Sequence, residues 1–429
     1  MRLIDVILPL AIRDTYTYAV PANMPDPVSG MRVLVPLMKK TITGVVLRMY
    51  EADAPEGIQL REAIEILDDS PIVLPSQLQL WRWIADYYLC TIGEVMVAAL
   101  PSKLIDNDYT AQTETYITLS DRYEDVEELQ PVFDNLKRAP KQLELLEIFL
   151  EMCGVFDGEN HPVERRELVE QSGGSTAVLR TLIEKEILVE KKEVVSRLTS
   201  YDLTVENAHE LNVGQQQAKA EIESGFVEGK VCLLHGVTSS GKTEVYIHLI
   251  RRMLDAGKQV LYLVPEIALT TQLTTRLQRI FGKQLGVYHS RFSNMERVEI
   301  YKDLLNSSEP KVILAARSGV FLPFTNLGLI FVDEEHDSSF KQQDPAPRYH
   351  ARSVAIVMAQ YAAANVLLGT ATPAIESYYN AQTGKYKLVE LTQRYAGIEL
   401  PAIRLVDLKM QYHRKEMYEH FADPLVEMI

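Results

Sequence analysis

The sequence predicts a multidomain α/β protein with three successive folded parts. The chain has 429 residues, and at roughly 150 residues per domain we expect about three domains. Short β-like runs separated by Pro and Gly come first, a helical pattern follows, and apolar strands then alternate with amphipathic helices. We place the domain boundaries at residues 1–104, 105–200 and 201–429.

Composition and charge narrow the class of protein. The hydrophobic fraction of 47% and the charged fraction of 24% are ordinary for a globular protein and exclude a collagen-like or disordered chain. The net charge of −15 argues against binding nucleic acid through an overall positive field, so such contacts need local basic patches. Residues 1–50 hold six Lys and Arg against three Asp, whereas residues 121–160 are strongly acidic. This contrast indicates separate modules.

The sequence indicates neither a secretion signal nor a membrane span. Asp5 interrupts the apolar start, and no small-residue cleavage site follows it. The longest apolar stretch, residues 353–368, contains Gln360 and Asn365 and is typical of a core helix running into a strand. Three widely spaced cysteines can form neither a disulfide framework nor a CxxC zinc site. We therefore expect a soluble cytoplasmic protein with no membrane partner.

The first domain is predicted to be small and β-rich. Its β-like runs are LIDVILPL, YTYAV, MRVLVPL and ITGVVLRMY, separated by Pro and Gly turn signals. A helical stretch follows from Gln77 to about Tyr88. The pattern therefore indicates a β-rich domain with a helical appendage.

The second domain changes to a helical period. PKQLELLEIFLEM at residues 140–152 is an amphipathic helix, and STAVLRTLIEKEILVEKKEVVSRL at residues 175–198 is typical of a helix that turns into a strand pair. Three helices followed by a β-wing indicate a winged-helix domain over residues 105–200. The alternative is another small three-helix bundle.

The third domain alternates strands with helices. Its strand-like runs are VCLLHG, QVLYLVP, LGVYHS, KVILAA, LGLIFVDEE and NVLLGTATP, and its helix-like runs include TEVYIHLIRRMLDAG and ALTTQLTTRLQRIFG. Near-continuous apolar strands between amphipathic helices are typical of a parallel sheet covered on both faces.

A phosphate-binding motif follows the first of these strands. The run HGVTSSGKT carries GxxxxGK[ST] between a strand and a helix, which is the context that this motif requires. Backbone N–H groups and the helix N-terminus of such a turn face phosphates, while Lys neutralises charge and Thr ligates Mg²⁺. The alternative is a glycine turn with an incidental Lys. The candidate nucleotide-binding residues are Gly236, Val237, Thr238, Ser239, Ser240, Gly241, Lys242 and Thr243.

Two further motifs end apolar strands. In DEEHD, Asp333 is expected to hold the Mg²⁺ shell and Glu334 to orient or deprotonate the attacking water, and the alternative is a solvated strand end. The second motif is GTATP, whose hydroxyl groups can hydrogen-bond the acidic strand end. The candidate coupling residues are Glu335, His336, Thr370 and Thr372, although Glu335 and His336 could serve only as a hydrogen-bonded link to GTATP.

Taken together, these motifs resemble superfamily 2 helicases. GVTSSGKTEVY, LVPEIALTTQ, DEEHDSSFKQQDPAPRYHAR and GTATP follow the order of the first, RecA-like P-loop lobe of that superfamily, and specifically of the PriA family of replication-restart helicases. In the first domain, TYTYAVP, RVLVPL, TGVV and IADYYLCTIGEVMVAALP resemble that family's 3′-end DNA-binding domain. The resemblance covers nearly the whole chain and is weakest over residues 105–200.

The resemblance implies further residues of the motor lobe by matching positions. Gln215 resembles the glutamine that reads adenine, and the alternative is a helix-capping amide. DNA contacts are implied at Pro265, Glu266, Thr270, Gln272, His289, Ser290, Arg317 and Ser318. An aromatic-rich loop that stacks bases and contacts phosphates is implied at Phe340, Lys341, Arg348 and Tyr349, and the alternative is a packed surface loop.

In the first domain, the resemblance implies a pocket for the terminal base and 3′-hydroxyl. The matching residues are Tyr16, Thr17, Tyr18 and Arg61. Thr17 departs from the family, because many members carry an acidic residue there. In the motor lobe, AARSG replaces the usual GTRSA, and Thr370 stands where Ser is common.

The resemblance implies a bacterial, nucleoid-associated ATP-dependent 3′ to 5′ DNA helicase. Such an enzyme uses ATP and Mg²⁺, binds stalled or branched forks and single-stranded DNA with a 3′ end, and initiates primosome assembly for replication restart. The implied protein partners are other primosome proteins, single-stranded-DNA-binding protein and the proteins that load the replicative helicase. The alternatives are a non-enzymatic fork-binding module and another superfamily 2 translocase.

The family pattern continues beyond the last residue of this chain. Members carry a cysteine-rich zinc module and a second motor lobe with an arginine finger, and neither follows Ile429. We therefore expect a fragment that is inactive or weakly active by itself, with Zn²⁺ only in the missing part.

Overall fold

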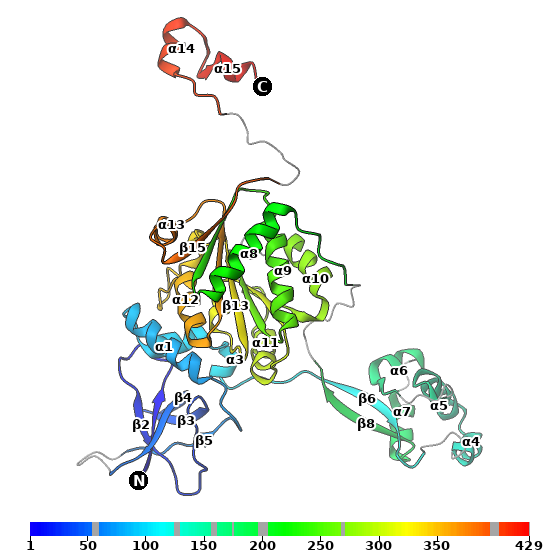
Figure 1. The fold of residues 1–429 in the computed structure, drawn as a ribbon. Coiled ribbons are helices and arrows are strands. Elements are labelled where there is room, and N and C mark those ends of the chain that lie inside the picture. Colours follow the sequence, from blue (N-terminus) through cyan, green and yellow to red (C-terminus); the bar gives the residue numbers. More distant parts are fainter. Residues whose placement is uncertain are drawn as a thin grey trace. The chain divides into compact units, whose positions relative to one another are not determined.

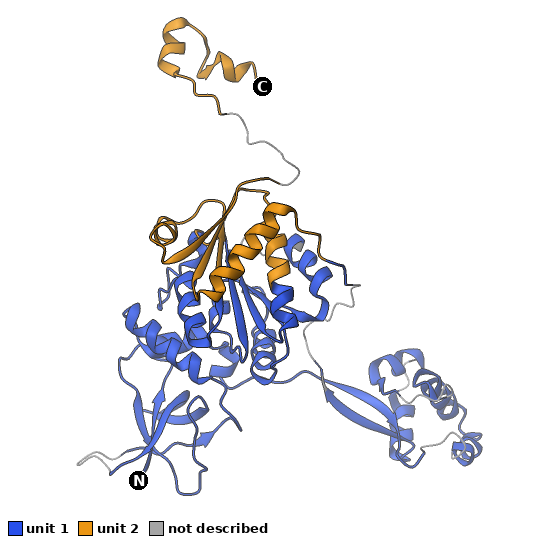
Figure 2. Ribbon diagram, viewed as in Figure 1, with its two compact units in different colours: residues 1–207, 250–333, 337–366 blue, residues 208–249, 334–336, 367–429 orange. Residues whose placement is uncertain are grey.

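The computed structural model describes residues 1–53, 60–123, 129–155, 161–173, 176–195, 205–266, 271–394 and 403–428 (Figure 1). Two compact units divide the chain, coloured separately in Figure 2. The first unit comprises residues 1–207, 250–333 and 337–366, and the second comprises residues 208–249, 334–336 and 367–429. The multidomain α/β class expected from the sequence is confirmed. No described helix is long and apolar enough to cross a membrane.

The first unit begins with a five-stranded antiparallel sheet in the order β2-β1-β4-β3-β5. Alternating apolar side chains close one core, in which Ile4, Val33 and Val46 are fully buried. The four expected β-like runs each form a strand. The strands are β1 (Arg2–Ile7), β2 (Tyr16–Ala19), β3 (Arg32–Leu37), β4 (Lys40–Glu51) and β5 (Glu65–Ile66).

Three helices follow this sheet: α1 (Pro75–Tyr87), α2 (Ile92–Ala99) and α3 (Ser102–Ile105). Proline starts α1, and a capping box of Thr91 and Glu94 starts α2. The helix expected from Gln77 to about Tyr88 is therefore confirmed with slightly different ends. The helix α2 was not expected.

The helix α1 packs against the α/β part of the first unit. It contacts α12 (Ala351–Ala362). Gln77 is buried, and its Nε2 donates to the carbonyl of Phe321 over 2.7 Å. The hydroxyl of Tyr301, also buried, donates to the carbonyl of Ile72 over 3.0 Å. These contacts join the helical appendage to the α/β domain through a fully buried polar link.

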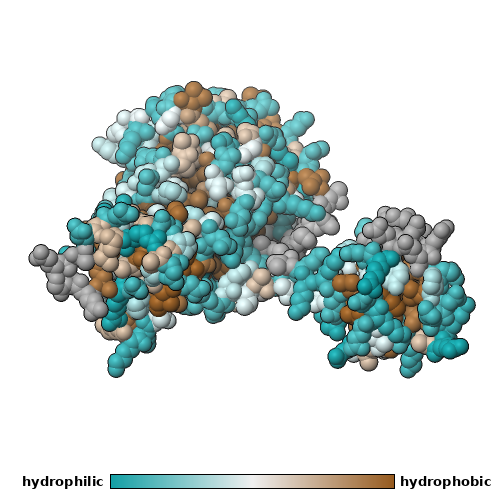
Figure 3. Space-filling view, turned by 90° about the horizontal axis from the view of Figure 1, so that it is seen from below, coloured by the Kyte–Doolittle hydropathy of each residue, from teal (hydrophilic) through white to brown (hydrophobic). Residues whose placement is uncertain are grey.

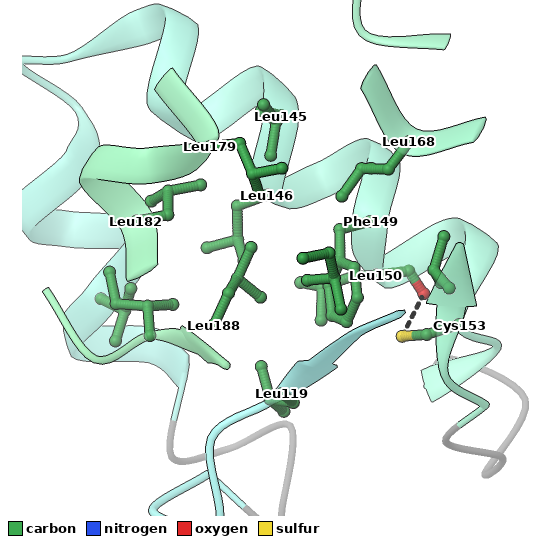
Figure 4. Close-up of a cluster of buried hydrophobic side chains, with 14 of the residues drawn as sticks. Leu119, Leu145, Leu146, Phe149, Leu150, Cys153, Leu168, Leu179, Leu182 and Leu188 are labelled. Carbon is green, nitrogen blue, oxygen red and sulfur yellow. Dashed lines mark hydrogen bonds between the residues drawn. The ribbon is translucent and has the colours of Figure 1, made fainter. Parts of the chain in front are cut away.

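Residues 113–194 contain the helices and strands of the expected winged helix. Its core joins all the helices with the sheet, and Figure 4 shows Leu146, Phe149, Leu182 and Leu188 converging there. The elements are β6 (Thr113–Leu119), α4 (Gln130–Leu136), α5 (Pro140–Met152), β7 (Val163–Glu164), α6 (Arg165–Gln171), α7 (Thr176–Glu184) and β8 (Leu188–Val194).

One feature of the wing differs from the sequence interpretation. The strand that follows α7 is β8, and it pairs antiparallel with β6, in the sheet order β7-β6-β8. The expected strand pair within residues 175–198 is therefore one strand with a distant partner, because β6 already supplies a complementary edge. Residues 196–204 lie outside the described residues.

A seven-stranded sheet runs through the third part of the chain in the order β11-β12-β10-β13-β14-β9-β15. The strand pairs β10–β12, β10–β13, β11–β12, β14–β9 and β15–β9 are all parallel. The strands are β9 (Val231–Gly236), β10 (Gln259–Leu263), β11 (Leu285–Tyr288), β12 (Val312–Ala315), β13 (Leu327–Asp333), β14 (Asn365–Thr370) and β15 (Tyr386–Leu391).

Both faces of this sheet are covered. Leu261 and Tyr262 are neighbours in β10 and so point to opposite faces, and both are fully buried. This explains the near-continuous apolar strands of the sequence. The helices of this part are α8 (Val213–Val227), α9 (Lys242–Asp255), α10 (Thr271–Phe281), α11 (Asn294–Asn306), α12 and α13 (Ile375–Gln382).

The remaining elements lie near the carboxyl end of the chain. They are α14 (Leu408–Arg414), β16 (Met417–Tyr418), β17 (Phe421–Ala422) and α15 (Asp423–Val426). The face of the molecule in Figure 3 is mostly hydrophilic, with hydrophobic side chains in scattered patches. Such a distribution is ordinary for a protein surface.

Candidate nucleotide and DNA sites

The glycine-rich motif forms the turn between β9 and α9, as its sequence context requires. Ser239 and Gly241 adopt left-handed φ values of 64° and 80°. A Cβ added at Gly241 would lie 2.3 Å from Nε2 of Gln215, so only glycine fits there. Lys242 begins α9, and its Nζ donates to the carbonyl of Gly236 over 3.0 Å.

The polar groups of this turn fit a phosphate chain. The buried Oγ of Ser240 has no hydrogen-bond partner among the described residues. A Cβ at Gly236 would lie 3.0 Å from the Lys242 side chain, so glycine there leaves room for the lysine to cross the turn. The turn leads into the N-terminus of α9, where backbone N–H groups favour an anion. An unused donor, a cation and a helix N-terminus therefore meet at one place.

The second unit brings the phosphate-binding, acidic and GTATP motifs together. Lys242 Nζ lies 4.0 Å from Oε1 of Glu334, and Nδ1 of His336 lies 3.7 Å from Oε2 of the same carboxylate. The same His336 nitrogen lies 2.8 Å from Oγ1 of Thr370, and its Nε2 lies 3.3 Å from Oγ1 of Thr372. Lysine, glutamate, histidine and two threonines thus form one connected polar chain.

Glu334 has an unusual backbone in this chain of contacts. Its φ is 47°, in the left-handed region that a residue with a Cβ seldom adopts. The strand β13 ends at the preceding residue, so the chain turns sharply where the carboxylate approaches Lys242. Such strain is typical of residues held for a function.

Glu335 links the acidic motif to residues at and after GTATP. It is fully buried, and its carboxylate accepts hydrogen bonds from the Ala374 N–H (2.7 Å) and the Ser377 hydroxyl (2.8 Å). Its own N–H donates to the carbonyl of Gly369 over 3.1 Å. The linking alternative weighed from the sequence therefore describes the geometry of Glu335.

Asp333 is the last residue of β13 and belongs to the first unit. Its Oδ2 accepts a hydrogen bond from the hydroxyl of Tyr262 in β10 over 3.1 Å. A neighbouring strand thus holds this carboxylate at the carboxyl end of the parallel sheet. Ligand sites of parallel sheets lie at this end.

Gln215 acts as a helix cap and a brace for the phosphate loop. Its Oε1 accepts from the Asn212 N–H over 3.0 Å, and the Asn212 side chain accepts from the Gln215 N–H, which completes a capping box. Its Nε2 donates to the carbonyl of Ser240 over 3.2 Å. Both ends of the amide are therefore engaged within the chain, and the capping alternative matches what the structure shows.

The DNA-contact candidates of the first unit follow the carboxyl ends of adjacent strands. Pro265 and Glu266 follow β10, His289 and Ser290 follow β11, and Arg317 and Ser318 follow β12. The parallel order β11-β12-β10 places these ends at one edge of the sheet. Gln272 is exposed near the start of α10, and Thr270 lies outside the described residues.

Direct contacts join some of these candidates. The hydroxyl of Ser290 donates to Glu266. His289 stacks on Phe292, with ring centroids 4.3 Å apart and planes 5° apart. Burial and then the nearby Arg291 lower the pKa of His289, so its ring is neutral near pH 7. Arg317 Nη1 lies 3.4 Å from the carbonyl of Ser339, which connects this edge to the aromatic-rich loop.

The expectation that Phe340 and Tyr349 stack bases is wrong for this structure. Phe340 is fully buried, and Tyr349 is 1% exposed with its ring 5.0 Å from that of Phe321. Burial also raises the pKa of Tyr349. The hydrophobic effect has drawn both rings into the core, so the packed-loop alternative holds for them.

The charged residues of the same loop remain at the surface. Arg348 donates through Nε to the carbonyl of Gln343 over 2.8 Å. Lys341 donates to the carbonyl of Arg348, and its Nζ lies 5.1 Å from the ring centre of Tyr88. The loop can therefore offer charge to a ligand, but not the two rings inferred from the sequence.

The first-domain pocket is only partly assembled as expected. Tyr16 is 39% exposed, whereas Tyr18 is a core residue whose hydroxyl donates to the carbonyl of Pro36 over 3.2 Å. Burial raises the pKa of Tyr18, and the nearby Arg61 opposes that shift. Thr17 lies between the two tyrosines in β2 and so points to the opposite face. Tyr16, Tyr18 and Arg61 share a region, and Thr17 does not join them.

Thr17 instead meets Asp5, a residue that sequence reasoning missed. Asp5 is 5% exposed. Its carboxylate accepts from the hydroxyl of Thr17 (2.8 Å), from Nε of Arg48 (2.6 Å) and from the hydroxyl of Tyr50 (3.2 Å). The signal in the sequence was an acidic residue in the middle of the apolar run RLIDVI, because a buried carboxylate requires partners.

Comparison with protein families matches three consecutive domains. The descriptions are a 3′ DNA-binding domain of PriA over residues 5–101, a winged-helix domain of the PriA helicase of Bacteroidota over residues 114–195, and a DEAD/DEAH box helicase domain over residues 212–381. The three matches follow the order of the domains that we expected, and they confirm the fold class.

Similar proteins share most of this chain. The replication restart protein PriA of Bacillus subtilis is 31% identical, over 95% of this chain and 58% of that protein. PriA of Haemophilus influenzae is 34% identical, over 96% and 54%. The chain therefore spans a little over half the length of these relatives. A solved structure of RecG bound to a three-way DNA junction is 22% identical with a TM-score of 0.34, over 44% of this chain and 25% of that chain.

Proposed function

The chain belongs to the PriA family of replication restart proteins, and we propose that it forms the DNA-recognising part and first motor lobe of an ATP-dependent 3′ to 5′ DNA helicase. The complete protein would bind stalled or branched forks and initiate primosome assembly. The observation that carries the proposal is the polar chain from Lys242 through Glu334 and His336 to Thr370. It joins three motifs that are far apart in the sequence.

Residues 236–243 would hold the phosphates of ATP. Lys242 neutralises phosphate charge, the buried Ser240 hydroxyl supplies a donor that lacks a partner within the described chain, and Gln215 braces the loop from α8. Thr243 and Asp333 would hold Mg²⁺. The magnesium ion supplies Lewis-acid polarisation of the phosphate oxygens when bound. Glu334 is the base candidate, because its carboxylate lies 4.0 Å from Nζ of Lys242, where it would orient or deprotonate the attacking water.

The remaining polar residues would couple the hydrolytic site to DNA. His336 contacts both Glu334 and Thr370. A change in the position or charge of the Glu334 carboxylate would therefore alter the hydrogen bonds at the end of β14. Glu335 holds the start of α13 through Ala374 and Ser377. These contacts give the GTATP segment a direct connection to the acidic motif.

The DNA surfaces would lie in the first unit. The motor-lobe contacts are Pro265, Glu266, Thr270, Gln272, His289 and Arg317, together with Lys341 and Arg348 of the loop. Tyr16 and Arg61 of the first domain are the accessible members of the proposed 3′-end pocket. The proposed partners are forked DNA, single-stranded DNA with a 3′ end and the primosome proteins of the cytoplasm.

The first test replaces the lysine of the phosphate loop in the full-length protein. Lys242→Ala should reduce DNA-stimulated ATP hydrolysis by about 10² to 10³-fold, because one charged donor to the phosphates is removed. Binding of a fork with a 3′-hydroxyl should remain within about twofold. Lys219→Ala removes a lysine of the neighbouring helix α8 and should leave both readouts unchanged. Equal loss of fork binding and hydrolysis in Lys242→Ala would contradict separate DNA and nucleotide sites.

The second test separates this proposal from other superfamily 2 translocases. Forks that end in a 3′-hydroxyl or a 3′-phosphate should bind with different affinities, because a pocket for the strand end contacts that group directly. Equal binding of both forks would contradict the proposed 3′-end pocket and favour another class of superfamily 2 translocase.

A further inference from the structure

The carboxyl end of α1 carries three aromatic rings in mutual contact. The rings of Trp83 and Tyr87, one helical turn apart, stack with centroids 4.8 Å apart and planes 18° apart. Tyr88 meets both edge-on, at 6.1 Å from Trp83 and 4.9 Å from Tyr87. The three rings therefore form one ordered cluster, which we call the α1 aromatic cluster.

This cluster lies at the edge of the core, with Trp83 and Tyr88 half-buried. The packing face of α1 is made by other residues, among them Trp81 and Ile84, which are fully buried. Tyr87, in contrast, is 64% exposed.

Leu89 directly follows the cluster with 93% of its surface exposed. Its left-handed φ of 52° belongs to the helix end, where the Cys90 N–H donates to the carbonyl of Ala85 over 3.0 Å. An ordered ring stack therefore lies beside an exposed leucine at the surface, where both can contact a ligand.

Positive charge from another segment flanks the same rings. Lys341 Nζ lies 5.1 Å from the ring centre of Tyr88. The N–H of His350 donates to the hydroxyl of Tyr88 over 3.1 Å, which ties the cluster to the loop that contains Lys341. Burial raises the pKa of Tyr88, and the positive charge of Arg352 is among the groups that oppose this shift. The one acidic neighbour within the helix is Asp86.

We propose that Trp83 and Tyr87 form a stacking platform for unpaired bases of single-stranded DNA, with Lys341 beside it to contact the phosphate backbone. Flat rings with adjacent cations are the combination that binds single strands, because bases stack on rings while cations neutralise phosphates. The flanking cations favour this polyanion over an apolar protein surface. The platform rests on the proposed function, since it extends the DNA path of the motor lobe onto α1.

The chain offers an internal probe for this platform. It contains only two tryptophans, Trp81 and Trp83, and Trp81 is fully buried. Base stacking on Trp83 should therefore quench tryptophan emission when the chain is titrated with oligothymidylate. Trp83→Phe should abolish the change in emission. It should retain binding measured by anisotropy of a labelled oligonucleotide, because phenylalanine keeps a ring.

Substitution of Tyr87 tests affinity directly. Tyr87→Ala should weaken oligothymidylate binding roughly five- to tenfold, the loss expected for one base–ring stack. Tyr87→Phe keeps the ring and should bind within about twofold of the unmodified chain. The matched control is Tyr379→Ala on α13, because Tyr379 is also 64% exposed. It should not alter binding.

The outcomes separate this inference from the proposed function. If the unmodified chain binds oligothymidylate, but Tyr87→Ala binds as tightly as Tyr379→Ala and emission does not change, the platform is wrong and the motor proposal stands. Failure of the unmodified chain to bind any single strand overturns both. Circular dichroism checks the fold, and Trp83→Leu, with the same expected loss, replaces Tyr87→Ala if that variant misfolds. A change in sedimentation with unchanged DNA binding would mean that the cluster contacts a second copy, which also overturns the platform.

Discussion

Glu335 in the second unit and Asp5 in the first are both carboxylates with at most 5% of their surface exposed, yet they are held differently. Glu335 accepts from neutral donors of one short segment, Ala374 and Ser377. Asp5 accepts from residues of two neighbouring strands, and one of its partners, Arg48, is a cation at the surface. One buried charge depends on local backbone geometry, and the other depends on strand register.

This difference has consequences for function and for stability. Removal of Glu335 leaves the buried Ser377 hydroxyl and the part-buried Ala374 N–H without their acceptor, so it should destabilise the segment after GTATP. Removal of Asp5 leaves Arg48 free to hydrate, because its side chain is already 67% exposed. We therefore expect the second unit to be more sensitive to loss of its buried carboxylate than the first.

The largest expected effect is that of Glu335→Ala. The substitution removes two hydrogen bonds to a charged acceptor and leaves the Ala374 N–H and the Ser377 hydroxyl unpaired, so it should lower the free energy of unfolding by about 3 kcal/mol. Urea unfolding followed by circular dichroism measures this loss. Glu335→Gln keeps one oxygen as an acceptor and is the control. Equal losses in the two variants would show that the hydrogen bonds to Glu335 do not set the stability of this region.

A smaller effect is expected for Asp5→Ala. The hydroxyls of Thr17 and Tyr50 lose a charged acceptor, which should lower the free energy of unfolding by about 2 kcal/mol. The same urea titration gives the value, and Asp5→Asn is the control because it keeps one acceptor oxygen. A loss larger than that of Glu335→Ala would reverse the proposed ranking of the two regions.

The same contrast explains what could be predicted from the sequence. The phosphate loop and Glu334 lie in contiguous motifs after apolar strands, so the sequence locates them, and the structure places Lys242 Nζ 4.0 Å from Glu334. Asp5 has its partners in other strands, and only the register of β1 against β2 and β4 reveals them. A functional group whose partners lie in the same short motif can be predicted from the sequence. A group whose partners lie on neighbouring strands cannot, because strand register is not visible in the sequence.

The aromatic residues show a second limit of the sequence. Phe340 and Tyr349 match a loop that stacks bases, yet burial decides which rings are available, and both lie in the core. Tyr18 of the expected first-domain pocket is likewise buried. The sequence did not predict Tyr87 as a base-stacking residue, although its side chain is exposed. Residue type was therefore predictable, but solvent exposure of single rings required the tertiary structure.

A third prediction adds a second carboxylate beside Asp5. Thr17→Asp places two like charges where Thr17 Oγ1 now lies 2.8 Å from Asp5. The two carboxylates should repel each other in the folded chain and lower the free energy of unfolding by about 1 kcal/mol while both are ionised. The cost should disappear when acid protonates them.

Urea titrations at several pH values measure this dependence. The free energy deficit of Thr17→Asp against the unmodified chain should shrink on acidification, because protonation removes the repulsion between the carboxylates. Thr17→Asn has the same shape without the charge and should show a deficit that does not change with pH. A pH-independent deficit in both variants would mean that Asp5 does not interact with position 17 through charge.

The smallest expected effect is a change in the labelling rate of a single thiol. Burial raises the pKa of Cys90 to about 11 and that of Cys232 to about 12. Both thiols are therefore protonated near pH 8 and should react slowly with iodoacetamide, because the thiolate is the nucleophile. Their reactivity should rise as pH increases toward these values. Mass spectrometry of peptides resolves the two sites.

The labelling rates of the two thiols also show which region of the structure unfolds locally in a variant. Cys232 lies in β9, in the same unit as Glu335, and Cys90 follows α1, in the same unit as Asp5. Glu335→Ala should speed labelling of Cys232 and leave Cys90 unchanged, because local opening exposes nearby groups first. Asp5→Ala should leave Cys232 unchanged. Equal acceleration of both thiols by either variant would show that the two regions open together, and the two carboxylates would then stabilise one cooperative structure.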